Sequence, residues 1–532
     1  MIQRLLLTLP LLLSAQVATA QTRVDPSDDL LAAVRALGPG SELILEDGTY
    51  TLGPRFGFEA LGTEVEPILI RAASGANPVV HRPNAAQNIW DFRGTHLTIR
   101  GLAFSGGSAG LRVEGGSDIT IEDCEIFDTA DVALRMNSVG ETYERIRILR
   151  NHIHHTSGTG EGMYLGCNND GCRLADSLIE GNYVHHTDGP AVSQGDGIEL
   201  KEGSYATTIR DNVIHDTNYP CLLGYSTAGN GARNVVEGNV MWNCGDHGIQ
   251  WEANAVLRNN IVLGAAQAAM ASQPHQAMGP NDLEIVHNTF INTGDVLTIR
   301  SASGTVVIAN NAVYSRDGRA IFFNGTGPTP TASGNAGAGA VQGLAASFIP
   351  GAMRTDFLGA TFLGAIPQSV YPTSTGVLAG AGDPVYAARV DFDGHLRMGI
   401  ADIGAYRVGT GPAWEIMEGF KASETPVVPG GDGGMSDAGS LDSGLGDAGP
   451  IDAGAGDAAV VDAGRSVDAS VALPDAGARD GSWGAEDAGT PSSSSGGGCS
   501  CSTGGSRGIP MSAFAVLALS LGFSRRRSGP VA

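Results

Sequence analysis

The chain has 532 residues, a formal net charge of −24 at pH 7 and a sequence pI near 4.8. This excess of acid argues against nucleic acid as a partner, because nucleic-acid binding depends mainly on Lys and Arg side chains that neutralise phosphates. The seven cysteines are too few for a small fold held together by disulfides.

Residues 1–20 have the pattern of a secretory signal peptide. Arg4 supplies the positive start, residues 5–13 form an apolar stretch, and Ala18-Thr19-Ala20 matches a small-residue cleavage site. The apolar stretch is shorter than the roughly 20 residues that span a bilayer, which argues against an uncleaved anchor. We therefore expect the protein to be exported.

The next region is built from short elements and a repeated motif. An amphipathic helix is expected over residues 28–37, and it is followed by residues 39–45 and 48–50. From there an Asn-x-apolar pattern, or a variant of it, recurs every 21–31 residues. The first residues of these repeats are Gly101, Cys124, Asn151, Asn182, Asn212, Asn239, Asn260, Asn288 and Asn311. The runs between them alternate in polarity and break at Gly, Asn and Asp, which predicts short strands separated by turns.

Repeats of this length without a helical period are typical of a solenoid whose coils stack on one another. Asparagine suits such a repeat because its side chain can satisfy the backbone of a turn. The pattern resembles the right-handed parallel β-helix of pectate-lyase-like proteins, over roughly residues 40–410. The resemblance implies an all-β, single-stranded right-handed parallel β-helix at residues 21–410, with a short N-terminal capping helix. Residues 393–397 and 402–406 resemble the closing segment of such proteins.

In a stack of this kind, equivalent residues on successive coils form rows about 4.8 Å apart, and alternate residues face outward. The residues expected in the core are Leu111, Val113, Leu134, Met136, Met163, Leu165, Ile198, Leu200, Ile249, Trp251, Leu297, Ile299, Ile321 and Phe323. One outward row is expected to hold Arg112, Arg135, Tyr164, Glu199, Leu222 and Gln250. The neighbouring row is expected to hold Glu114, Asn137, Gly166, Lys201, Gly224 and Glu252.

Polar, aromatic and mixed-charge side chains on one sheet face are what a sugar-binding groove requires. We therefore expect a polysaccharide partner. The residues expected to bind it are Arg135, Arg112, Gln250, Glu252 and His247. Lys201 is the only lysine of the predicted β-helix, and Gly166 and Gly224 on either side of it would leave a notch wide enough for a sugar ring.

A lysine in that notch can remove the proton alpha to a uronate carboxylate if its pKa is lowered. Glu199 and Tyr164 would then orient Lys201 or the substrate. The alternative is a surface lysine that pairs with Glu199 or Glu202 and contributes little to stability.

Residues 195–203, followed by Asp211-Asn212, resemble the lysine-bearing coil of the chondroitinase-B and alginate-lyase family. The resemblance implies a polysaccharide lyase that works by β-elimination with Lys201 as the base. That family has an arginine one coil later, where this sequence has Gly224, and the next arginine is Arg233. The competing hypothesis is a non-catalytic β-helix that binds glycans or serves as an adhesin or spacer.

A group of acids precedes the same strands. Glu161, Asp196 and Asp246 are candidate calcium ligands, since carboxylates on adjacent coils can supply the oxygens that calcium requires. Calcium would also reduce the repulsion between an acidic protein and an anionic polysaccharide. The alternatives are solvated turn acids or the paired carboxylates of a glycosidase. No other cofactor is expected.

His154, His185 and His215 occupy one row, with Phe127 and Trp242 in the same row on the flanking coils. Three histidines can bind zinc, but the repetition over five coils favours a stack of rings that belongs to the architecture.

The cysteines offer one expected disulfide. Cys167 and Cys172 can close a small loop in an exported protein. Cys124, Cys221 and Cys244 occupy different places on their coils, and we expect them to be unpaired.

Residues 411–498 form a linker rich in Asp, Ala and Gly, with too little apolar surface to fold. Cys499-Ser500-Cys501, an apolar stretch at residues 509–523 and Arg525-Arg526-Arg527 follow. This tail, residues 499–532, resembles the C-terminal sorting signal of myxobacterial surface proteins. It implies processing at Cys499 or Cys501 and a place on the outer cell surface, with release of the processed form as a further outcome. A plain single-pass tail is the alternative. Membrane contact is expected only through this tail, with its arginines cytoplasmic, and the protein is expected to be a monomer.

Overall fold

The computed structural model describes residues 21–422, except residues 56, 277, 345–347, 363, 365, 398 and 400. All of the described residues belong to one compact unit. The predicted signal peptide, most of the predicted linker and the predicted sorting tail with Cys499 and Cys501 lie outside the described residues. Within the described part of the chain, no helix has the length and apolar character needed to cross a membrane.

The first elements cover the start of a solenoid. Helix α1 (Leu30–Arg35) follows strand β1 (Gln21–Val24), and the side chain of Asp29 caps it by accepting a hydrogen bond from the backbone N–H of Ala32. Leu30 and Val34 on one side of this helix are buried in the core. The predicted capping helix is therefore confirmed, although it is shorter than residues 28–37.

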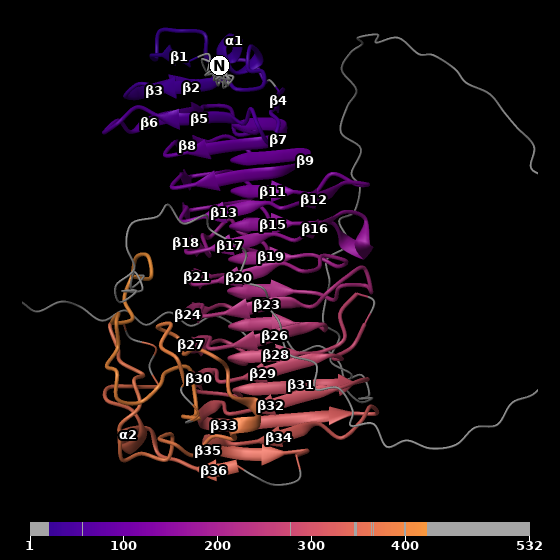
Figure 1. Cartoon of the computed structure of the whole chain (residues 1–532), viewed down its shortest axis with the longest axis vertical. Coiled ribbons are helices and arrows are strands. Elements are labelled where there is room, and N and C mark those ends of the chain that lie inside the picture. The colour runs from indigo at the N-terminus through magenta and orange to yellow at the C-terminus, as the bar shows by residue number, and fades with distance from the viewer. Residues whose placement is uncertain are drawn as a thin grey trace, which may run out of the picture. The chain divides into compact units, whose positions relative to one another are not determined.

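Within the described residues there are 36 strands, nearly all of them in three columns, and every pairing between named strands is parallel (Figure 1). The first column contains β4 (Gly57–Leu61), β7 (Trp90–Arg100), β9 (Leu111–Glu122), β11 (Leu134–Met136), β15 (Met163–Leu165), β19 (Ile198–Leu200), β22 (Leu222–Gly224), β25 (Ile249–Trp251), β28 (Met270–Ser272), β31 (Leu297–Ala302), β33 (Ala312–Gly325) and β35 (Asn335–Gln342). The second column contains β1, β2 (Glu42–Leu45), β5 (Ile68–Ala72), β13 (Arg147–Leu149), β17 (Leu178–Glu180), β20 (Thr208–Arg210), β23 (Asn234–Glu237), β26 (Ala255–Arg258), β29 (Leu283–Val286), β32 (Val306–Ala309) and β34 (Thr331–Ser333). The third column contains β3 (Gly48–Thr51), β6 (Pro78–Arg82), β8 (Ala103–Gly106), β10 (Glu125–Phe127), β14 (His152–His154), β18 (Tyr183–Thr187), β21 (Val213–Thr217), β24 (Val240–Cys244), β27 (Ile261–Ala265), β30 (Thr289–Asn292) and β36 (Phe348–Pro350).

Four long strands turn a corner and belong to two columns. β7 and β9 continue from the first column into the second, and β33 and β35 pass from the third column into the first. Two short strands, β12 (Thr142–Glu144) and β16 (Arg173–Ala175), pair between the first and second columns. The 3-10 helices span Asn168–Asp170 and Pro384–Tyr386. One turn of the solenoid therefore passes through all three columns.

The interior is apolar, as the alternation in the sequence predicts. All of the residues expected in the core, from Leu111 to Phe323, are buried. They belong to one hydrophobic cluster that runs from Val24 to Phe323 along the solenoid. Burial of this surface is the main source of stability for stacked coils, because each coil contacts only its neighbours.

The repeated asparagines form a continuous hydrogen-bonded ladder beside the core. The Oδ1 of Asn182 accepts from the backbone N–H of Asn151 at 2.9 Å and from its Nδ2 at 3.0 Å. The Nδ2 of Asn182 in turn donates to the carbonyl of Ile148 at 2.9 Å. The same arrangement continues through Asn212, Asn239, Asn260, Asn288 and Asn311.

The ladder has one more member than the sequence pattern indicates. Asn335 accepts from the backbone N–H of Asn311 at 3.0 Å. The pattern does not reveal it because the residue two positions later is Gly337 rather than an apolar residue. Hydrogen bonding in the ladder therefore requires the asparagine, while the apolar position is dispensable at the last coil.

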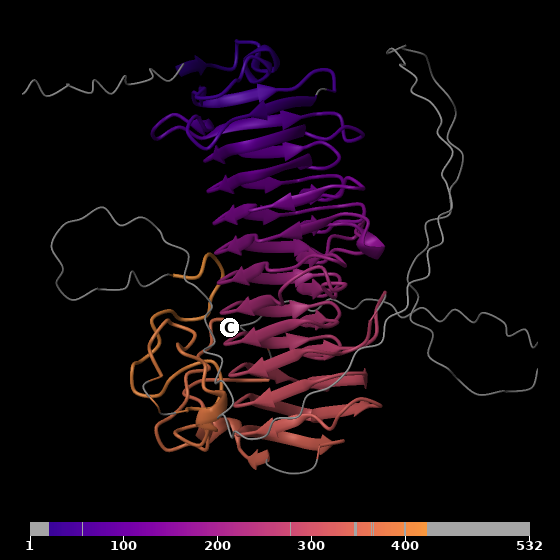
Figure 2. The same ribbon diagram turned by 45° about the vertical axis from the view of Figure 1, so that its right-hand side comes forward.

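The chain leaves the solenoid after β36, the last strand among the described residues. Residues 353–422, which contain α2 (Met353–Asp356), fold back beside the third column (orange in Figures 1 and 2). A second apolar cluster joins this segment to the column, with Phe392 and Tyr406 on one side and Tyr183 and Trp242 on the other.

Two cations, Arg397 (buried) and Lys421 (half-buried), hold the returning segment in place. The Nη2 of Arg397 donates to Asn259 Oδ1 at 3.2 Å and to the carbonyl of Ala405 at 2.8 Å. The ammonium of Lys421 pairs with Asp211 at 2.5 Å. The predicted closing segment at residues 393–397 and 402–406 thus lies against the side of the solenoid, because its apolar residues pack on the third column rather than on the last coil.

The predicted start of the linker at residue 411 is also wrong. Trp414 and Ile416 are buried in the second cluster. These apolar side chains give residues 411–422 enough buried surface to fold, so a disordered linker cannot begin before residue 423.

Candidate functional site

The predicted outward row exists on the first column, with one correction. Pairing aligns Arg112 with Arg135, Arg135 with Tyr164, and Tyr164 with Glu199. The next member is Leu223, which pairs with both Glu199 and Gln250. The prediction of Leu222 was wrong by one residue: Leu222 pairs with Ile198 and Ile249 and belongs to the core. A slip of one residue moves a side chain to the opposite face of a strand.

The same slip removes Gly224 from the neighbourhood of Lys201. Gly224 pairs with Leu200 and Trp251 in an inward row, and a Cβ at this glycine would lie 2.3 Å from the Trp251 ring. The glycine therefore makes room for the indole in the core. Tyr225 follows Gly224 and occupies the row of Lys201.

Gly166 does adjoin Lys201, as predicted. It adopts a φ of +100°, and a Cβ there would lie 2.9 Å from the Cβ of Lys201. Of the two glycines expected beside Lys201, Gly166 is therefore present, and Tyr225 takes the place of the other.

Lys201 lies between two tyrosine rings rather than on the floor of an open notch. Its Nζ is 4.4 Å from the ring centroid of Tyr164 and 5.1 Å from that of Tyr225, distances at which a cation is attracted to an aromatic face. The same ammonium pairs with Glu199, whose Oε1 also accepts from the Tyr225 hydroxyl at 3.1 Å. Only 5% of Lys201 is exposed.

This environment keeps Lys201 charged. Burial by itself lowers the pKa of Lys201, but Glu199, Tyr164 and Asp196 together outweigh burial and raise it. For the two phenols burial acts in the other direction: it raises the pKa of Tyr164 and of Tyr225, so both keep their protons. Lys201 is therefore an ammonium in this state, whereas a general base must be the neutral amine.

Three buried carboxylates converge beside Lys201. Oxygen atoms of Glu161, Asp196 and Glu199 lie within 4.8 Å of one another. Among the described residues, Glu161 Oε2, Asp196 Oδ1 and Glu199 Oε2 are buried without a hydrogen-bond partner. Burial, with the charge of Glu199 next, raises the pKa of Asp196, and burial also raises that of Glu161. Unsatisfied buried oxygens are costly, and hard oxygen donors in this arrangement fit calcium.

Asp246 is not part of this group, contrary to the prediction. Asp196 and Asp246 precede strands β19 and β25, which are two coils apart. Two coils correspond to about 10 Å, too far for one ion. His247 Nε2 is 3.8 Å from Asp246, and His247 Nδ1 accepts from the backbone of Ala268 at 3.1 Å. His247 therefore contacts Asp246 beside it and the following coil, and neither residue reaches the carboxylates near Lys201.

The arginines considered in the sequence analysis form ion pairs with neighbouring acidic residues. Arg135 Nη1 lies 3.3 Å from Asp131, and Arg112 Nη1 lies 3.6 Å from Glu114. Arg233 lies 3.5 Å from Glu284. Arg135 and Arg112 nevertheless line the same outer face as Tyr164, one and two coils away from it respectively.

Glu252 anchors a loop that the sequence pattern does not reveal. Its Oε1 accepts from the backbone N–H groups of His275 and Met278 at 3.1 and 2.8 Å. The His275 ring stacks on Tyr225, with centroids 4.9 Å apart, so it adds to the wall beside Lys201. Burial raises the pKa of Glu252 to about 8. No repeat position marks His275, because it lies in a loop between coils.

A family model described as a right handed beta helix region matches residues 76–182 and 162–336. The parallel columns and this match agree. The described strands, from β1 to β36, form a right-handed parallel β-helix. No curated protein sequence matches the chain.

Solved structures with a similar fold include several proteins that act on polysaccharides. An alginate lyase from Paenibacillus sp. str. FPU-7 is 22% identical over 51% of this chain and 99% of its own, with a TM-score of 0.39. Pectate lyase Pel9A is 14% identical over 74% of this chain and 97% of its own, with a TM-score of 0.40. The A-module of the Azotobacter vinelandii mannuronan C-5 epimerase AlgE4 is 13% identical over 61% of this chain and 94% of its own, with a TM-score of 0.42. Similarity at this level concerns the fold alone.

The β-helix carries two disulfides among the described residues. Cys167 and Cys172 are joined, as expected. Cys221 and Cys244 are also joined, with Cα atoms 5.3 Å apart, so the expectation that they are unpaired was wrong. Cys221 precedes β22 and Cys244 ends β24 on the next coil, and stacking brings these different positions together. Cys124 is a buried free thiol, and burial raises its pKa to about 12.

The histidine row of the β-helix is a stack of rings, as predicted. Phe127, His154, His185, His215 and Trp242 follow one another with centroid separations of 5.4, 5.1, 5.1 and 4.3 Å. The planes of neighbouring rings are inclined by at most 16°. The stack follows directly from the parallel register of the third column.

Proposed function

We propose that this β-helix binds and cleaves an anionic polysaccharide by β-elimination on the outer face of its first column. The observation that carries the proposal is the position of the Lys201 ammonium beside the converging carboxylates of Glu161, Asp196 and Glu199. Tyr164 and Tyr225 flank the ammonium. β-Elimination requires a cation near the uronate carboxylate, a base for the alpha proton and an acid for the leaving oxygen.

The side chains on this face can meet those requirements. The protonated Lys201 attracts the uronate carboxylate. The Tyr164 and Tyr225 phenols keep their protons, so either phenol is a candidate for the acid that protonates the leaving oxygen. Among the groups that raise the pKa of Lys201, Glu199 is the largest. Neutralising Glu199 would therefore lower the pKa of Lys201 and favour the neutral amine that a base requires.

Calcium is the cofactor that we propose for this face, with Glu161, Asp196 and Glu199 as its ligands. The three unpartnered buried oxygens support this choice. When bound, calcium would offset the negative charge that otherwise repels an anionic polysaccharide.

The experiment is a lyase assay on alginate, pectate and glycosaminoglycans, with calcium supplied and unsaturated uronate measured by its ultraviolet absorbance. Wild type should form product, and Lys201→Ala should lose at least about 100-fold in rate. The matched control is Lys421→Ala, which removes the only other lysine and lies in the returning segment, away from the first column. Far-ultraviolet circular dichroism should verify that both variants are folded. If wild type forms no unsaturated uronate from any of the three polymers, cleavage by β-elimination is excluded.

A second candidate function is glycan binding without catalysis. Two observations favour it. Lys201 is enclosed, and Tyr225 lies on the following coil, where the lyase family resembled by residues 195–203 has an arginine. A glycan array would then show selective binding that Arg135→Ala weakens, while the lyase assay stays negative.

We also propose that the protein is exported by residues 1–20 and tethered to the cell surface by residues 499–532. The support is the order of the sequence features at the two ends. Mass spectrometry of the mature protein should find an N-terminus at Gln21 and a C-terminal boundary at Cys499 or Cys501. A full-length cytoplasmic chain would contradict this proposal.

A further inference from the structure

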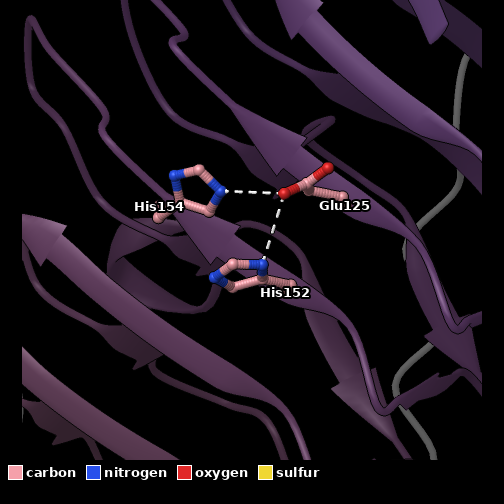
Figure 3. A group of neighbouring side chains, drawn as sticks. All are labelled: Glu125, His152 and His154. Carbon is pink, nitrogen blue, oxygen red and sulfur yellow. Dashed lines mark hydrogen bonds and ion pairs between the residues drawn. The ribbon is translucent and has the colours of Figure 1, made fainter. Parts of the chain in front are cut away.

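Six histidines gather on or directly after strands of the third column, which the proposed polysaccharide site does not use. Two of them, His152 and His154, belong to β14 and are separated by one residue, so both project from the same face of the strand. Glu125 on β10 pairs directly with His152. Figure 3 shows the three side chains turned toward one another.

The distances within this group are those of a metal site. Glu125 Oε1 lies 3.3 Å from His152 Nδ1 and 3.2 Å from His154 Nε2 (Figure 3). Two ligand atoms bound to zinc at about 2.0–2.1 Å in tetrahedral geometry are about 3.3 Å apart. The side chains therefore need little movement to accept an ion. Two imidazoles and a carboxylate are a typical donor set for zinc, whereas calcium prefers oxygen alone.

The ring of His154 is held in place before any ion binds. It stacks between Phe127 and His185, with interplanar angles of 16° and 4°. A side chain that is already ordered loses little conformational entropy on binding, which favours affinity.

The remaining ring nitrogens have partners of their own. His152 Nε2 lies 2.8 Å from His185 Nε2, and His154 Nδ1 lies 2.6 Å from His155 Nδ1. Metal-binding histidines commonly donate their other N–H to a neighbour, which orients the ring. When His152 and His154 donate in these outer bonds, their inner nitrogens present lone pairs to the Glu125 carboxylate, and a cation fits between the three. When His152 and His154 instead accept in the outer bonds, their inner nitrogens carry protons that point at Glu125 and leave no room for a cation. Zinc binding distinguishes the two arrangements.

The group also borders a cavity. A cavity of about 720 Å³ lies between the corner of the second and third columns and residues 390–394 and 420–422, and Glu125 and His152 line it. Acidic residues outnumber basic ones in its lining, which favours a cation over an anion. The side chains of Glu125 and His152 are 43% and 30% exposed, so one side of the group remains accessible to solvent.

We propose that Glu125, His152 and His154 form a zinc-binding site with an open coordination position toward this cavity. Three protein ligands and one open position are the arrangement of zinc sites that bind an exchangeable water or small ligand. The site lies on the third column and is independent of the polysaccharide site on the first column.

The test is a zinc titration of the full chain after chelator treatment. Isothermal titration calorimetry and competition with a chromophoric chelator each measure the zinc affinity. Wild type should bind one zinc ion per chain at this site. Glu125→Gln and His152→Asn, which conserve size, should each weaken binding by at least about tenfold. The control is His96→Asn, a partly exposed histidine outside this group whose affinity for zinc should be that of wild type.

A second readout does not depend on calorimetry. Zinc should raise the melting temperature of wild type and of His96→Asn, and should raise that of Glu125→Gln much less, because ligands that bind only the native state stabilise it. An absence of zinc binding by wild type would overturn the proposal. So would equal zinc affinities for wild type and for folded Glu125→Gln and His152→Asn.

Discussion

The Nζ of Lys201 lies 4.4 Å from the ring centroid of Tyr164, one coil earlier on the same face of the β-helix. This contact closes one side of the ammonium, and the Glu199 carboxylate neutralises it. The candidate site is therefore a buried ion pair enclosed by aromatic rings, and its energetics can be tested directly.

Lys201→Met should destabilise the protein by about 3–5 kcal/mol, because it leaves the buried Glu199 carboxylate without a counter-charge. Lys201→Met combined with Glu199→Gln should recover much of that loss. Urea unfolding followed by circular dichroism measures both.

Lys421→Met is the matched control for this pair. Its partner Asp211 has a side chain that is 41% exposed, so water can solvate the carboxylate after the substitution. A loss for Lys201→Met no larger than that for Lys421→Met would show that Glu199 is not electrostatically isolated.

Gly224→Ala should destabilise the protein by about 1–3 kcal/mol through overpacking, because the new Cβ would lie 2.3 Å from the Trp251 ring. Gly53→Ala is the control, since a Cβ there has no atom within 4 Å. Chemical denaturation measures the two free energies of unfolding. Equal losses of unfolding free energy for both variants would mean that Gly224 faces outward, in the register predicted from the sequence.

Asn239→Ala should cost about 2–4 kcal/mol, because it removes the acceptor of the Asn212 backbone N–H and the donor to the Ile209 carbonyl. Both groups are deep in the ladder, where water cannot replace the lost partner. Asn77→Ala, at an exposed position, should change stability by less than about 0.5 kcal/mol. A small effect at Asn239 would indicate that the ladder is not a major source of stability.

Glu252 should make the protein less stable as the pH rises from mildly acidic to mildly basic. Burial raises its pKa from 4.5 to about 8 in the folded state, so between these values the native state holds a proton that the unfolded state has lost. This contribution is complete below the unfolded pKa and disappears as the pH rises through the folded pKa.

Glu252→Gln should therefore flatten the dependence of the unfolding free energy on pH between about pH 5 and about pH 8. The amide oxygen can still accept from the His275 and Met278 backbones, so the loop should stay in place. An unchanged pH slope in the variant would assign the dependence to other buried acids such as Asp196.

The sequence predicted the candidate site only in part. Tyr164, Glu199 and Lys201 could be brought together from their spacing, because these residues lie in strands whose alternation is unambiguous. Tyr225 and His275 could not, because the former required the correct register and the latter lies in a loop. Glu161 and Asp196 were expected together, whereas Glu199 replaces Asp246 as the third carboxylate.

The amino-acid sequence by itself determined the coiled architecture, the asparagine ladder and the stack of rings from Phe127 to Trp242. These features repeat over several successive coils, and a periodic pattern of side chains is visible before any contact is known. Only the tertiary structure decided the register at Gly224, the Cys221–Cys244 bond and the return of residues 353–422 along the third column. A strand of three residues can shift by one position at little local cost. The choice is then made by packing between coils that are distant in the chain, here by the room that the Trp251 indole requires.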